Sequence, residues 1–114
     1  MATLQELHNN SDWDYLLEIS AEKPVLLFKH STTCPISAGA FDQYQSFLAN
    51  GEHVPQSYMV KVIESRTVSN QVERDTGVKH ESPQIFLIRD KEVVWHTSHG
   101  NITAESIKEA LNQK

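Results

Sequence analysis

The stretch "VLLFKHSTTCPISAGAF", residues 25–41, decides the fold of this chain. Its first six residues form a short, mostly apolar run after a proline, which predicts a central strand covered on both faces. Cys34 follows, and Pro35 suits the first turn of a helix because its missing N–H is not needed there. The stretch therefore predicts a strand that leads directly into a helix at Cys34.

An apolar face marks the helix that starts at Pro35. Its members recur at helical spacing and are Ile36, Ala40, Tyr44, Phe47 and Leu48. We expect this helix to end at Gly51.

Upstream, the sequence predicts another helix, with Ser11 as its N-cap and the Lys23-Pro24 pair as its stop. Trp13 and Leu16 lie at helical spacing within it, and we expect Trp13 to be a core residue. No pattern decides the structure of residues 4–8.

Strands and helices continue to alternate downstream of Gly51. The predicted elements are a strand at 57–63, a helix at 67–76 with Val68 and Val72 facing inward, a strand at 84–88, an antiparallel strand at 93–99 and a closing helix. Gly77 is expected in a left-handed conformation after the middle helix. Thr103 is the expected cap of the last helix, and Ile107, Ala110 and Leu111 form its apolar stripe.

This order of elements predicts an α/β fold with a central mixed β-sheet flanked by helices on both faces. We expect residues 1–114 to form a single domain, since 114 residues is an ordinary size for one compact unit. Trp95 is expected to be a core or partly buried aromatic.

Composition excludes several classes of function. Ten Lys and Arg against fifteen Asp and Glu give a formal charge of −5, and no basic run is present, so we expect no nucleic-acid partner. No apolar stretch is long enough to span a bilayer, and the N-terminal residues lack a signal pattern. We therefore expect a cytoplasmic monomer with no membrane partner.

Cys34 is the only cysteine, which excludes an internal disulfide. A lone cysteine is usually a small core hydrophobe. Here it lies in a polar "STT" approach at the start of a helix, where the helix dipole and free N–H groups favour a thiolate. The sequence therefore predicts an exposed, reactive thiol with a lowered pKa.

Three neighbours of Cys34 are further candidates for the site. Ser37 lies one helical turn away, at the position of the second thiol in a Cys-x-x-Cys motif, and we expect its hydroxyl to donate to the sulfur. Lys29 and His30 end the strand and point to opposite faces, so one of them can face Cys34. Taken singly, a solvated Lys and a packed His are the expected states.

Two other features, a zinc site at His30 and Cys34 and a cis peptide bond before Pro83, have little support from the residues alone. His30 and Cys34 are too few ligands for a closed zinc site, so we expect no metal. Pro83 precedes a buried strand, and by base rate its peptide bond would be trans.

Taken together, "FKHSTTCPIS" and the block "GVKHESPQIFLIRDKEVVW" resemble a known family. The chain is similar to thioredoxin-fold proteins and, more narrowly, to the monothiol bacilliredoxins, the bacillithiol-system thioredoxin-like proteins of the YtxJ type. The resemblance spans nearly the whole chain. It implies a thioredoxin-like fold in which the cysteine opens a helix beside a cis proline.

The resemblance also implies roles for individual residues. Cys34 would act as the nucleophile with Ser37 beside it, while Pro35, Ser82 and a cis Pro83 would position the substrate. In thioredoxin-like proteins the backbone before that proline pairs with the bound disulfide in a strand-like contact.

The implied activity is a thiol-disulfide oxidoreductase of the oxidative stress response, which removes bacillithiol from S-bacillithiolated proteins. Cys34 would take over the small thiol, and a second bacillithiol or a reductase would release it. No tightly bound cofactor is implied; bacillithiol is a co-substrate. Its malate part would favour basic groups, and the candidates are Lys29, His30, Lys79 and His80.

Two alternative functions stay open at this point. In the first, the chain is a non-catalytic redox adaptor, whose cysteine records oxidation without turnover. Alternatively, it is a monothiol carrier of an iron–sulfur cluster, held with an external thiol.

Overall fold

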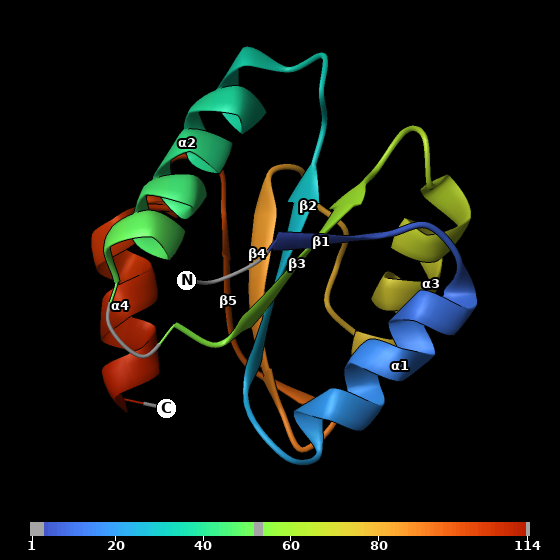
Figure 1. Ribbon diagram of the computed structural model, residues 1–114. Helices are drawn as coiled ribbons and strands as arrows, with labels where there is room; N and C mark the ends of the chain where they lie inside the picture. The colour runs from blue at the N-terminus through green and yellow to red at the C-terminus, as the bar shows by residue number, and fades with distance from the viewer. Residues whose placement is uncertain (1–3, 52–53, 114) are drawn as a thin grey trace.

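A computed structural model describes residues 4–51 and 54–113 of the chain. The elements are β1 (Leu4–Leu7), α1 (Asn10–Ser20), β2 (Val25–His30), α2 (Pro35–Asn50), β3 (Gln56–Lys61), α3 (Arg66–Thr76), β4 (Gln84–Arg89), β5 (Glu92–Ser98), the 3-10 helix η1 (His99–Asn101) and α4 (Ala104–Gln113). Figure 1 shows one twisted sheet between two layers of helix. The predicted α/β fold with helices on both faces is confirmed.

The sheet is mixed, with the strand order β1-β3-β2-β4-β5. β3 runs parallel to β1 and β2, whereas β4 is antiparallel to both β2 and β5. β2 lies in the middle, so both of its faces and both of its edges are covered, and all six of its residues are buried. This position explains why its sequence is an apolar run without polar alternation.

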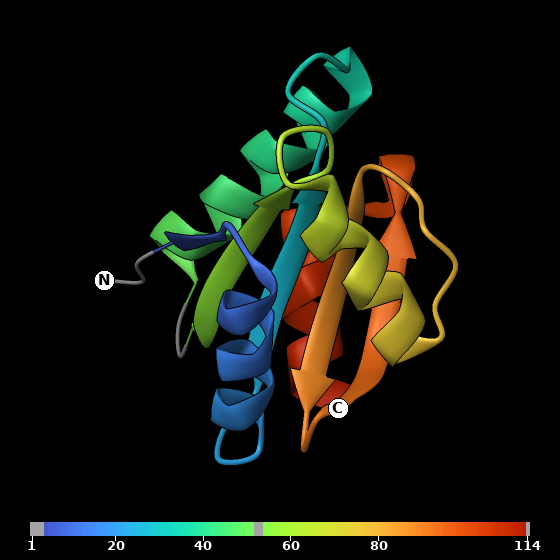
Figure 2. The same cartoon turned by 90° about the vertical axis from the view of Figure 1, so that its right-hand side faces the viewer.

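Alternation along β2 divides the core into two halves. Val25 and Leu27 pack under α1 and α3, while Leu26 and Phe28 pack under α2 and α4. Figure 2 shows the two helical layers on opposite sides of the strands. Trp13 is fully buried in the first half, as expected, and donates from its indole N–H to Asp75 at 2.8 Å.

The N-terminal segment differs from the sequence-based expectation. Helix α1 begins earlier than predicted, because Asn9 rather than Ser11 is its N-cap and accepts from the backbone N–H of Asp12 at 2.9 Å. Residues 4–7 form an edge strand, β1, against β3. A four-residue strand is too short to show a period in the sequence, and its pairing depends on the free edge of β3.

Most other local predictions are confirmed. Val68 and Val72 are buried, Gly77 has a left-handed φ of 71°, and Thr103 caps α4 by accepting from the Ser106 N–H at 2.9 Å. Ile36, placed on the apolar face of α2, is instead 59% exposed. Figure 1 shows the reason, since the first turn of α2 extends past the end of the sheet.

Candidate functional site

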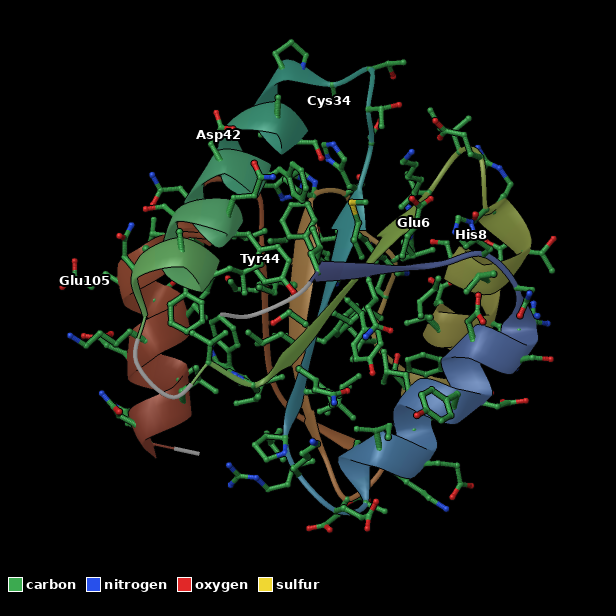
Figure 3. All side chains as sticks on the ribbon, in the orientation of Figure 1. Glu6, His8, Cys34, Asp42, Tyr44 and Glu105 are labelled. Atoms are coloured by element: carbon green, nitrogen blue, oxygen red, sulfur yellow. The ribbon has the colours of Figure 1, made fainter. Side chains whose placement is uncertain are left out.

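Segments that are distant in sequence meet at one end of the sheet. Lys29, near the end of β2, pairs with Gln84 at the start of antiparallel β4, and His30 pairs with Lys61 at the end of β3. Cys34 follows β2 and Pro83 precedes β4, so the register brings their segments to this end. Figure 3 shows Cys34 here, where the loop from β2 enters α2.

Cys34 is the N-cap residue of α2 and is partly exposed. Its N–H donates to the Ser31 carbonyl at 3.2 Å, and its own carbonyl accepts from Ala38 at 3.0 Å, which fixes the backbone on both sides of the sulfur. Pro35 occupies the first helical turn, as predicted. The unpaired N–H groups of this turn and the positive end of the helix dipole lie at the thiol. The chain thus presents its thiol at a helix start, outside the two core clusters.

Ser37 is fully buried, and its hydroxyl points toward the strand. Its Oγ accepts from the Ser31 N–H at 3.0 Å and lies 2.8 Å from His30 Nδ1. With the Ser31 N–H donating to the oxygen, the Ser37 hydroxyl donates its hydrogen bond to His30 Nδ1 in the tautomer that carries the ring proton on Nε2. The expected hydrogen bond from Ser37 to the Cys34 sulfur is therefore replaced by contacts that close the loop between β2 and α2.

We expect Ser37→Ala to lower the free energy of unfolding by about 1–3 kcal/mol, because it leaves the Ser31 N–H and His30 Nδ1 without their partner. Urea denaturation measures this loss. Ser46→Ala, an exposed change in the same helix, is the control and should alter stability by less than about 0.5 kcal/mol. Equal stability of the two variants would contradict the role of Ser37 as a loop clamp.

His30 is the strand residue on the α2 side, and it is packed, as expected. Only 8% of its surface is exposed, and its ring stacks on Phe41 with centroids 4.6 Å apart. Burial is the main cause that lowers its pKa, with Glu64 opposing this effect and Lys61 adding to it. His30 is therefore neutral at pH 7, which lets Nδ1 accept a hydrogen bond from the Ser37 hydroxyl.

Lys29 lies on the opposite face of the sheet, and the expectation of a solvated side chain is wrong. Its exposed fraction is 0%, and its ammonium donates to the Ser69 carbonyl at 3.2 Å and to His80 Nδ1 at 3.0 Å. Burial lowers its pKa to about 8, against the attraction of Glu73. Lys29 is thus shielded from solvent and cannot bind a malate carboxylate directly, because Ser69, His80 and Phe86 surround its amine.

The Ser82-Pro83 peptide bond is cis, as the family resemblance implied and contrary to the base rate. Pro83 is buried, and its carbonyl accepts from the His99 N–H at 3.0 Å. The Ser82 hydroxyl oxygen is buried as well, and no hydrogen-bond partner for it lies within residues 4–51 and 54–113.

Lys79 and His80, the two basic candidates before Pro83, lie in different surroundings. Lys79 is exposed, so its ammonium is free to meet an anion in solution, whereas the His80 ring is held by Lys29. Sequence analysis missed Gln84, which is fully buried and binds this segment through the Lys79 carbonyl at 3.0 Å and the Glu81 N–H at 3.2 Å. A polar residue opening the apolar run "QIFLI" was the available signal.

No three His, Cys, Asp or Glu side chains of residues 4–51 and 54–113 gather in a way that would hold a metal ion. Within the same ranges, no helix is both long and apolar enough to cross a membrane.

Comparison with known proteins agrees with this geometry. Residues 5–107 match the family described as monothiol bacilliredoxin BrxC. A solved structure described as a candidate oxidoreductase with a thioredoxin fold is 36% identical, with a TM-score of 0.86 over 95% of this chain and 93% of that one.

More distant structures share the fold alone. Thioredoxin of Fasciola hepatica is 14% identical, with a TM-score of 0.75 over 96% of this chain and 97% of that one. Thioredoxin of Trypanosoma brucei brucei is 8% identical, with a TM-score of 0.77 over 97% and 89% of the two chains. The chain therefore has a thioredoxin fold and belongs to the monothiol bacilliredoxin family, whose role is thiol redox chemistry.

Proposed function

We propose that this protein removes bacillithiol from S-bacillithiolated proteins by transferring it to Cys34. The observation that carries the proposal is a single, partly exposed thiol at the start of α2, with a hydroxyl at the position of a second thiol. A family match to the monothiol bacilliredoxins supports the small thiol as the group transferred. We place the reaction in the cytoplasm and expect a monomer without a tightly bound cofactor.

The transfer exchanges one disulfide for another. The Cys34 thiolate attacks the bacillithiol sulfur of the mixed disulfide, a new S–S bond forms to Cys34, and the original S–S bond breaks. Its electron pair leaves on the target sulfur, which takes up a proton and becomes a free thiol. A second thiol, from bacillithiol or a reductase, then attacks the bacillithiol sulfur of the adduct: a new S–S bond joins these two sulfurs, the bond to Cys34 breaks, and Cys34 leaves as a thiolate.

Ser37 determines how long the adduct lasts. An oxygen cannot form a disulfide, and its hydroxyl is already bound to His30 and Ser31. The adduct on Cys34 therefore persists until an external thiol arrives. Of the basic candidates for the malate carboxylates, Lys79 has an exposed side chain, and we propose it as the group that attracts this part of the small thiol.

Intact mass spectrometry of the protein mixed with a bacillithiol-modified target tests this function. We expect the mass of bacillithiol to move from the target to Cys34 within minutes, with release of the unmodified target. If neither mass moves while iodoacetamide still alkylates Cys34, the transfer activity is ruled out, and the redox adaptor or cluster carrier becomes the better hypothesis.

A further inference from the structure

A buried amine is unusual in a protein of this size, and Lys29 is fully buried, with no carboxylate of residues 4–51 and 54–113 bonded to it. Burying an ammonium is costly unless its hydrogen bonds are satisfied. Two of its N–H groups have acceptors, Ser69 O and His80 Nδ1, and the amine also lies 5.8 Å from the centre of the Phe86 ring. An apolar side chain of similar size would fill this space without the cost of burying a charge. The hydrogen bonds of the amine therefore indicate its role.

The contact with His80 links Lys29 to residues 77–83, the segment between α3 and β4. Figure 2 shows this segment rising beside α3 toward the end of the sheet at which α2 begins. The segment is irregular, so its shape depends on side chains. It ends at Ser82 and cis Pro83, the residues proposed to meet the substrate disulfide.

Buried and partly buried residues hold the segment at successive points. Lys29 binds the His80 ring at 3.0 Å, and Glu73 accepts from the His80 N–H at 2.8 Å. Gln84, the strand partner of Lys29, binds the residues on either side of His80. Glu81 accepts from the Ser98 hydroxyl at 2.9 Å. Lys29 and Gln84, both buried and paired across β2 and β4, thus hold the segment in place through hydrogen bonds.

We propose that Lys29 is a positioning residue, which acts through His80 to hold residues 77–83 in the conformation that presents Ser82 and Pro83 to a substrate disulfide. This inference rests on the proposed function, because it assigns a role in the same exchange reaction. The hydrogen bonds of its amine go to Ser69 and His80, so its effect on the site passes through this segment.

The contact depends on the protonation of His80. An ammonium has only donors, so His80 Nδ1 must be the acceptor and the imidazole must be neutral. Burial and the neighbouring Lys29 lower the pKa of His80, Arg66 adds to this effect, and Glu73 and Glu81 oppose it. As the pH falls through this lowered pKa, Nδ1 gains a proton that faces the Lys29 ammonium, and the contact breaks.

A matched pair of His80 variants tests the proposal. His80→Gln keeps an acceptor for Lys29 but cannot titrate, whereas His80→Leu removes the acceptor. At pH 7 we expect His80→Leu to lower kcat/KM for bacillithiol transfer about 10- to 100-fold, the loss typical of a displaced substrate contact, and His80→Gln to retain most of it. Alkylation of Cys34 by iodoacetamide, which needs no substrate contact, should stay within about twofold of wild type in both variants.

The pH profile separates positioning from a structural role. Between pH 5 and 7.5, the ratio of transfer rate to alkylation rate should fall on acidification in wild type and stay level in His80→Gln. Dividing by the alkylation rate removes changes in the intrinsic reactivity of the thiol from the comparison. Equal ratios in wild type, His80→Gln and His80→Leu at every pH would overturn the proposal.

Amide hydrogen exchange gives a readout that does not depend on activity. We expect the amides of His80 and Glu81 to exchange about tenfold faster in His80→Leu and in Lys29→Met than in wild type, because a charge-assisted hydrogen bond is lost. Lys108→Met, an exposed change on α4, is the control. Unchanged exchange in both variants would overturn the positioning role. If wild type transfers no bacillithiol while the two variants still exchange faster than wild type, the proposed function alone is overturned.

Discussion

Cys34→Ser is expected to abolish bacillithiol transfer, leaving only the uncatalysed rate. Serine oxygen cannot form a disulfide, and Cys34 is the only cysteine in the chain, so no other residue can accept the small thiol. Mass spectrometry should show an unmodified variant and a target that keeps its bacillithiol. This change removes one sulfur atom and tests the chemistry with little disturbance of the surroundings.

The same variant should keep its fold. Cys34 is partly exposed and has no side-chain cap hydrogen bond, so replacing it should change the free energy of unfolding by about 0.5 kcal/mol or less. Circular dichroism and urea unfolding check this point. A folded variant that still releases unmodified target at the wild-type rate would refute Cys34 as the acceptor. A variant that fails to fold would instead support a core role for the thiol.

The second large effect is on stability. We expect Phe28→Ala to lower the free energy of unfolding by about 3–5 kcal/mol, since Phe28 is fully buried on β2 beneath α2. Its ring stacks on Tyr44 with centroids 5.3 Å apart and also contacts Phe41 and His30. The change therefore removes the centre of an aromatic cluster that supports the helix carrying Cys34.

Denaturant unfolding measures this loss, and Ile36→Ala serves as the comparison. Ile36 is a large apolar residue in α2 but is 59% exposed, so its truncation should cost about 0.5 kcal/mol or less. Phe28→Leu should lie between the two, because it leaves a smaller cavity. A Phe28→Ala variant as stable as Ile36→Ala would show that the aromatic cluster does not support α2.

Much of the fold follows from patterns local to the chain. The apolar run of β2, the Pro35 helix start, the left-handed Gly77 and the Thr103 cap are each set by a few adjacent residues, and all appear as predicted. Short-range sterics and capping hydrogen bonds act in the same way in any fold. Strand β1 is an exception, because it forms only when β3 offers an edge.

The candidate site was predictable in part. The position of Cys34 at a helix start follows from "TTCP" alone, whereas the cis bond before Pro83 was expected only through the family resemblance. The partner of the Ser37 hydroxyl was not predictable. Several donors and acceptors lie within reach of one helical turn, and the choice of His30 and Ser31 depends on how α2 packs on β2.

Lys29 shows most clearly where local patterns end and packing begins. Alternation along β2 correctly puts Lys29 and His30 on opposite faces, and residue type favours a solvated lysine. Whether a lysine at a strand end is solvated depends on what covers that face, and here Ser69 of α3, His80 and Phe86 of β4 surround the amine. Those residues lie 40 to 57 positions away in the chain, so their approach is decided by the tertiary structure.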